Sequence, residues 1–143
     1  MQIVQTPQLI ALLYEGAPSS VYRIIYMDGR PHPKDFETSY MGDSIGHWEG
    51  DTLVIDTIGF NTATWLDIMG YMHSENMHVI ERLHRDGNML TWQATVDDPD
   101  VLLHAWEMNP RVVRLNPDPN AEIPESPPCS ERDYAHVVTK EHH

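Results

Sequence analysis

Apolar and polar positions alternate with a period of two over much of the chain, in short runs. This is the pattern of β-strands that bury one face and expose the other. Eight such runs are predicted, at residues 2–6, 9–14, 21–27, 44–48, 52–60, 78–85, 89–96 and 106–115. The short links between them hold Gly, Pro or Asp, which favour turns. The pattern predicts a mostly β fold, an antiparallel up-and-down, lipocalin-like barrel of about eight strands in which sequence neighbours pair.

Three longer links, at residues 28–41, 61–77 and 97–105, interrupt this rhythm and are predicted to be ligand-contacting loops at the ends of the barrel. Pro110 should make the last run an edge strand or a bulged one, which could pair with a second copy. Residues 116–128 hold five prolines. We therefore expect a barrel domain at residues 1–115 and a Pro-rich strap or tail at residues 116–143.

Residues 78–94 are predicted to form a β-hairpin that contains a carboxylate on its apolar face. With Asp86-Gly87 as the two-residue turn, Val79 lies opposite Ala94, Glu81 opposite Trp92 and Leu83 opposite Leu90. Five of these six side chains are apolar, so Glu81 should point inward. A buried carboxyl group must be hydrogen-bonded, ion-paired or neutral, and such groups gather at functional sites. Glu81 is therefore either a structural group paired with an Arg or an amide, or a general acid or base beside Trp92.

A second hairpin is predicted at residues 44–57, with Gly50-Asp51 as its loop. This register places Trp48 opposite Leu53, His47 opposite Val54 and Ile45 opposite Asp56. His47 and Asp56 are then diagonal neighbours, either as an exposed pair worth less than about 1 kcal/mol or as a carboxylate that orients an imidazole. The opposite face, with Trp48, Leu53 and Ile55, is predicted to be the core face.

The predicted end loops supply the polar side chains that could approach Glu81. These are Arg30, His32, Asp67 and His73. Trp65 and Tyr71, in the 61–77 link, could close over a ligand, but they could equally plug the barrel, since small barrels fill their interiors with side chains.

The histidines lack the close spacing of a metal-binding motif, so a site formed by His32, His73 and His78 would depend wholly on how the loops fold. A metal is not predicted, and neither is an organic cofactor. The single cysteine, Cys129, allows no disulfide within the chain.

Charge narrows the range of partners. The chain of 143 residues has 22 acidic and 9 basic side chains, for a net charge of −13. This charge opposes binding to nucleic acid or to an anionic membrane, and no apolar run approaches the roughly 18 residues of a membrane helix. A small organic ligand that is neutral or cationic is favoured.

Several segments resemble a large group of uncharacterised, mostly exported bacterial proteins. They are Asp28-Gly-Arg-Pro-His-Pro33, the block from Gly42 to Asn61, Thr64-Trp-Leu-Asp67, and the stretch from His73 to Arg82. The resemblance runs from about residue 2 to about residue 99 and implies export, although this chain begins where longer members have already passed their leader. It implies no reaction. It does favour the residues within its motifs as site residues, namely Arg30, His32, Asp56, Trp65, Asp67, His73, Glu81 and Arg82.

Together these observations predict a small-molecule-binding β-barrel, and an acid–base enzyme of the hydrolase, lyase, isomerase or cyclase type is the leading hypothesis. Its catalytic residues would be Glu81, His73, Asp56 and His32. Its substrate would contact Arg30, Trp65, Asp67, Trp92 and Arg82, although Arg82 is predicted to face outward. The alternatives are a non-catalytic binding or interaction module and a His-ligated metalloenzyme.

Overall fold

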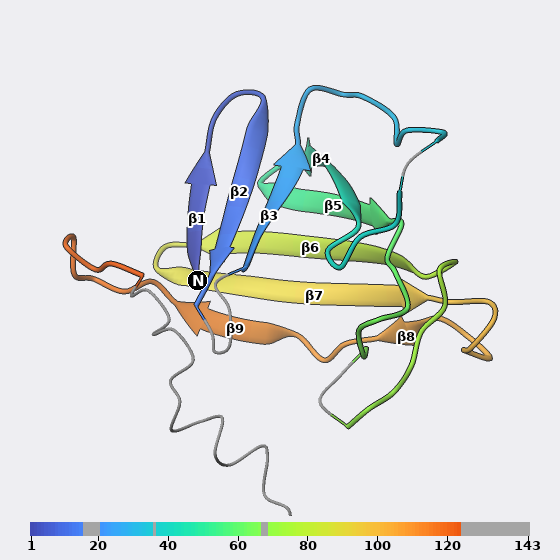
Figure 1. The fold of residues 1–143 in the computed structure, drawn as a ribbon. Helices are drawn as coiled ribbons and strands as arrows, with labels where there is room; N and C mark the ends of the chain where they lie inside the picture. Colours follow the sequence, from blue (N-terminus) through green and yellow to red (C-terminus); the bar gives the residue numbers. More distant parts are fainter. Residues whose placement is uncertain (16–20, 36, 67–68, 124–143) are drawn as a thin grey trace, which may run out of the picture.

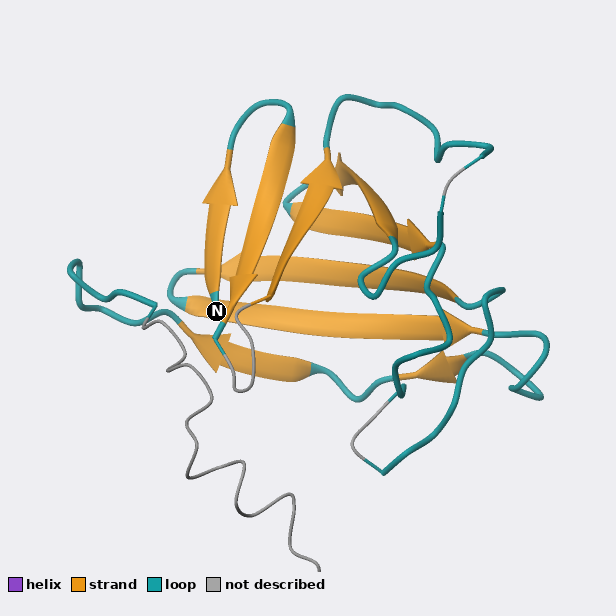
Figure 2. Cartoon of the chain, viewed as in Figure 1, coloured by secondary structure: helices purple, strands orange, loops and turns teal. Residues whose placement is uncertain are grey.

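The computed structural model describes residues 1–15, 21–35, 37–66 and 69–123 (Figure 1). Within these ranges the chain forms strands, turns and loops (Figure 2), and no helix there could span a membrane. The strands are β1 (Gln2–Gln5), β2 (Leu9–Tyr14), β3 (Val21–Tyr26), β4 (Asp43–Glu49), β5 (Thr52–Ile58), β6 (His78–Asp86), β7 (Met89–Asp97), β8 (Trp106–Glu107) and β9 (Arg111–Arg114).

The strands form one sheet that curls into a half-barrel. Its order follows the sequence from β1 to β8, and β9 also pairs with β7. This arrangement confirms the mostly β, barrel-like fold. One step departs from up-and-down order, because β3 and β4 are parallel and pair only through Ile25–Ser44 and Tyr26–Ile45. Residues 106–115 form two short strands on β7, separated by the segment that contains Pro110.

The β4–β5 hairpin has the predicted register, with Trp48 opposite Leu53 and Ile45 opposite Asp56. Its loop is Gly50-Asp51, and Gly50 has a φ of 62°. Only this first loop residue has a positive φ, as in a type II′ turn, and glycine adopts that conformation without a steric penalty.

The predicted register of the β6–β7 hairpin is wrong by one turn position. The loop is Gly87-Asn88 and not Asp86-Gly87, so Glu81 lies opposite Ala94 and Leu83 opposite Trp92. Gly87, with a φ of 56°, takes the first loop position, as Gly50 does in the other hairpin. Because the partners shift by two residues, every side chain keeps its predicted face, and Glu81 is buried as predicted, with 4% of its surface exposed.

The core lies between the two halves of the curled sheet, where β1–β3 cross β5–β7 (Figure 1). It consists of Ile10, Leu12, Ile25, Leu53, Ile55 and Leu83, with Tyr14, Met27, Leu90 and Trp92 packed against them. The prediction that Trp48 belongs to this core is wrong, since 49% of its surface is exposed. Trp48 lies beyond the two-residue contact of β3 with β4, so no strand covers it on that side.

Candidate functional site

Four polar side chains form a continuous hydrogen-bonded row on the outer face of the sheet. They are Asp43, His32, Asp56 and His78. His32 Nδ1 lies 2.6 Å from Asp43 Oδ1, and His32 Nε2 lies 3.2 Å from Asp56 Oδ1. His78 Nε2 lies 2.7 Å from the same Asp56 oxygen. Asp56 is therefore shared by two imidazole rings.

Strand alternation explains why these side chains share the outer face. Asp56 lies between the buried residues Ile55 and Thr57 on β5, so its side chain points away from the core. Asp43 and His78 are the first residues of β4 and β6, the two strands that flank β5. His32 comes from the long β3–β4 link, which crosses back to this face because β3 and β4 are parallel.

The end of the β3–β4 link is fixed against β5. A bridge joins Ser39 to Phe60, and the Asn61 amide donates to the Ser39 carbonyl at 2.8 Å. Gly42 has a φ of 67°, and a Cβ atom there would lie 2.6 Å from the carbonyl oxygen of Ile58. Only glycine allows this close approach. The approach holds the start of β4, at the next residue Asp43, against β5.

The hydrogen-bond chemistry assigns protons to the rings. Carboxylates only accept hydrogen bonds, so the doubly protonated ring is the form of His32 that satisfies both of its contacts. His78 needs a proton only on Nε2, which donates to Asp56. Its Nδ1 has no partner among the described residues, and 43% of its side chain is exposed. Asp56 thus orients a ring whose second nitrogen is accessible.

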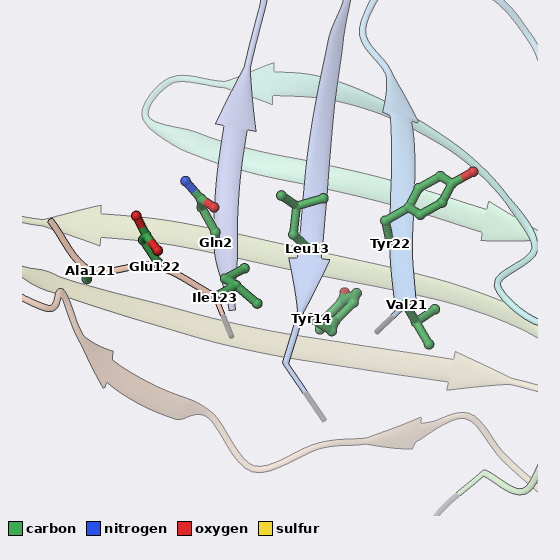
Figure 3. A pocket seen from close by; sticks show the side chains of 8 residues that line it. All are labelled: Gln2, Leu13, Tyr14, Val21, Tyr22, Ala121, Glu122 and Ile123. Atoms are coloured by element: carbon green, nitrogen blue, oxygen red, sulfur yellow. The ribbon is translucent and has the colours of Figure 1, made fainter. Parts of the chain in front are cut away.

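A pocket of about 280 Å³ adjoins this row at Asp43. It lies where β3 diverges from β4, and its lining comprises Tyr22, Arg23, Ile24, Tyr26, Met41, Gly42, Asp43 and Ser44. A larger pocket of about 500 Å³ lies where β1 begins, β2 ends and β3 begins, and residues 121–123 also line it (Figure 3). Neither Glu81 nor Trp92 lines either pocket.

Glu81 belongs to a buried network on the inner face. Its Oε2 lies 2.6 Å from Arg23 Nη2, and its Oε1 accepts a hydrogen bond from Trp92 Nε1 at 3.1 Å. The Arg23 side chain is 9% exposed. Tyr14 packs nearby, and burial raises the pKa of its phenol while the Arg23 cation opposes that rise. Arg23 is therefore the charged partner that a buried Glu81 requires. Trp92 donates a hydrogen bond to Glu81, and it does not line either pocket, where a substrate could contact it.

His73 belongs to a third network, which joins the two long loops at one end of the sheet. Its Nδ1 donates to the Ser74 carbonyl at 3.0 Å, and its Nε2 lies 2.8 Å from the Thr64 hydroxyl. Asp98 accepts two hydrogen bonds of 2.7 Å, from the amide and the hydroxyl of Ser74. No hydrogen bond or ion pair between described residues joins His73 to Glu81, so the predicted pair is not brought together.

The remaining predicted residues are distributed over the surface. Arg30 binds Asp28 and stacks 3.9 Å above the ring of Tyr26. Arg82 faces outward, as predicted, and pairs with Glu49. Trp65 is 68% exposed. Asp67, Cys129 and most of the predicted tail lie outside the described residues.

The predicted pairing of His47 with Asp56 is not formed. His47 instead lies 3.2 Å from Glu49, on its own strand, while Asp56 binds His32 and His78. The sequence did place His78 and Asp56 on outer faces, but their meeting depends on the β5–β6 register, which spans the long 61–77 link. No local sequence pattern marks Asp43 or Arg23 as a site residue, because the residues that they contact are distant in the sequence.

The described residues contain no group of three or more His, Cys, Asp or Glu side chains placed to hold a metal ion. Comparison of the chain with protein-family models, with curated proteins and with solved structures finds no match. A function for this chain must therefore be inferred from the geometry of the outer-face row of Asp43, His32, Asp56 and His78.

Proposed function

We propose that this protein performs acid–base chemistry on a small organic molecule at the row formed by Asp43, His32, Asp56 and His78. The observation that supports this proposal is the shared Asp56 oxygen, which lies 2.7 Å from His78 Nε2 and 3.2 Å from His32 Nε2. A carboxylate that holds one nitrogen of an imidazole while the other is accessible is the arrangement of a general base.

In this proposal His78 is the catalytic base. Its Nδ1 takes a proton from the substrate or from an attacking water, and the ring then carries a positive charge. Asp56 stabilises that charge, because its oxygen already accepts the Nε2 proton. The same proton returns from Nδ1 to the product or leaving group, so hydrolysis, elimination and isomerisation are all compatible with this step.

His32 and Asp43 are positioning residues for Asp56 in this proposal. The His32 ring occupies the space between the two carboxylates and contacts both. It fixes the orientation of Asp56 from the side opposite His78. This second contact keeps Asp56 in place when His78 changes its charge.

Glu81 is assigned a structural role here, although it was the first candidate from sequence. Its ion pair with Arg23 and its hydrogen bond from Trp92 lie inside the core, and it lines neither pocket. Arg30 remains a candidate substrate anchor because its side chain is 44% exposed and its guanidinium group contacts Asp28 and the Tyr26 ring. Membership of the exported bacterial group also remains part of the proposal and rests on the sequence motifs.

The test is a screen of small esters, lactones and elimination substrates with the wild type and three variants. We expect His78→Gln and Asp56→Asn to lower kcat/KM by about 10²-fold or more, the typical contribution of a general base. His47→Gln is the matched control, because His47 is an exposed outer-face histidine whose carboxylate partner, Glu49, lies outside the row. Turnover that survives the loss of His78 would contradict the proposal.

A non-catalytic binding module is the second candidate. The pocket of about 500 Å³ favours it, because its lining is mostly apolar or aromatic and it contains no acid–base pair. Binding of a screen compound without turnover, with chemical-shift changes around Tyr14 and Val21, would favour this alternative over the enzyme.

A further inference from the structure

We infer that the pocket of about 280 Å³ between β3 and the start of β4 is a subsite for an organic ammonium group. This inference rests on the proposed function and specifies its substrate class, a small amine. The juxtaposition that carries it is the carboxylate of Asp43 beside two tyrosines, Tyr22 and Tyr26, in the lining of one pocket.

The pocket exists because the parallel pairing of β3 and β4 is short. Only Ile25 and Tyr26 pair with β4, so the preceding residues of β3 diverge from it. The space left between them is lined on one side by Tyr22, Arg23, Ile24 and Tyr26 and on the other by residues 41–44. It is large enough for a small organic group and lies beside the proposed acid–base row.

Asp43 has one oxygen available to a ligand. Its Oδ1 contacts His32 at 2.6 Å, whereas its Oδ2 has no hydrogen-bond partner among the described residues. A carboxylate oxygen can accept a charge-assisted hydrogen bond from an ammonium N–H. Since Asp43 also contacts His32, an amine bound there would lie at the end of the row opposite His78.

The balance of charge around the pocket favours a cation. Arg23 is matched by Glu81, and Arg30 is hydrogen-bonded to Asp28 and also interacts electrostatically with Asp43, so neither provides an uncompensated positive charge. His32 can supply one positive charge against the two carboxylates, Asp43 and Asp56, that it contacts. The whole chain has a net charge of −13, which attracts cations and repels anions at long range.

The aromatic side chains support the same ligand class. Arg30 already places its guanidinium carbon 3.9 Å from the centre of the Tyr26 ring, so a cation of the chain itself occupies one face of this phenol and Tyr22 is the aromatic side chain offered to a ligand. Tyr22 lines the pocket and is 65% exposed, which leaves it accessible to a ligand. A carboxylate with flanking aromatic rings is the combination that recognises ammonium groups.

The test titrates the full chain with propylammonium chloride and follows the backbone amides by NMR, with sodium chloride as the ionic-strength control. We expect saturable shifts confined to residues 22–26 and 41–44. The neutral isostere 1-propanol and the anion propionate should not produce them. Equal binding of either compound would overturn the inference, and so would shifts that follow ionic strength alone.

Two variants and one control examine the contacts. Asp43→Asn should weaken propylammonium binding by about tenfold or more, as expected for the loss of a hydrogen bond to a charged group. Tyr22→Ala should also weaken it, and this variant leaves the Asp43–His32 contact intact if Asp43→Asn disturbs folding. Asp51→Asn makes the same charge change in the β4–β5 turn and should bind as the wild type does. Unchanged affinity in both Asp43→Asn and Tyr22→Ala would overturn the inference.

A third variant separates this inference from the proposed function. His78→Gln should bind propylammonium like the wild type, because His78 does not line the pocket. Amine binding in a protein whose turnover does not depend on His78 would support the subsite and contradict the proposed mechanism. His78-dependent turnover without saturable amine binding would support the mechanism and overturn the subsite.

Discussion

Arg23 on β3 and Glu81 on β6 form an ion pair across the inner face of the sheet, with 2.6 Å between Nη2 and Oε2. Both residues are buried, at 8% and 4% exposure. β3 and β6 are not neighbours in the sheet, so the pair ties its two halves together. Among the described residues, Arg23 Nε, Arg23 Nη2 and Glu81 Oε2 make no hydrogen bond of ordinary geometry, so the short Nη2–Oε2 contact compensates the two buried charges as an ion pair.

Glu81→Gln should therefore lower the free energy of unfolding by about 3–5 kcal/mol, because it leaves the Arg23 cation buried without a counter-charge. Urea denaturation at neutral pH measures this change. Glu49→Gln is the control, since Glu49 also pairs with an arginine but at the surface, and its effect should be small. A variant that is more stable than the wild type would mean that Glu81 is a strained functional group after all.

Asp98 should make the protein acid-sensitive. Burial alone would raise the pKa of its carboxyl, but the hydrogen bonds from Ser74 and from the Asp100 amide outweigh burial and lower the pKa below the usual 3.8. The unfolded chain then binds the proton more readily than the folded one. The stability that Asp98 contributes is thus present above about pH 4 and is lost as the pH falls through the lower folded value.

Asp98→Asn should remove this contribution. We expect a loss of about 1–3 kcal/mol near neutral pH, because an amide cannot accept both hydrogen bonds from Ser74. The difference from the wild type should shrink as the pH is lowered below 4, which thermal unfolding over a pH series measures. Asp97→Asn, on the exposed neighbouring position, is the control. A difference that stays constant in acid would contradict the assignment.

Gly42 and Gly50 offer a matched pair of alanine substitutions. Their φ values are similar, at 67° and 62°, so both variants should suffer comparable backbone strain. At Gly50 nothing lies within 4 Å of an added Cβ, whereas at Gly42 the Ile58 carbonyl oxygen lies at 2.6 Å. Gly42→Ala should therefore lower the melting temperature clearly more than Gly50→Ala. Equal effects would mean that the Asp43 end of β4 can move away from β5.

The two hairpins show what local sequence can establish. In both, glycine takes the first loop position, where φ is positive, and the following residue does not have a positive φ. Applying this rule to Gly50-Asp51 yields the correct register. Choosing Asp86-Gly87 as a type I′ turn puts Gly87 at the second loop position instead. The predicted register of β6 and β7 is then wrong, although each side chain is still assigned to the correct face of the sheet. Burial of Glu81 depends only on the faces, which is why it could be predicted.

The site could be predicted only in part, because its contacts connect distant strands. Asp56 and His32 were recognised individually, but the sequence does not show that the β3–β4 link crosses to the outer face. That crossing follows from the parallel pairing of β3 with β4, which involves only two residues of each strand. The partners of Glu81 and Asp56 were missed for the same reason, since Arg23 and His78 approach them through the sheet and not along the chain.

The tautomer of the His78 ring, measured by two-bond ¹H–¹⁵N NMR correlations in the wild type and in Asp56→Asn, tests the proposed acid–base site. We expect neutral His78 to carry its proton on Nε2 in the wild type, because that nitrogen donates to Asp56 at 2.7 Å. In Asp56→Asn this preference should weaken. A wild-type ring with its proton on Nδ1, or one unaffected by loss of the Asp56 charge, would contradict the proposed acid–base site.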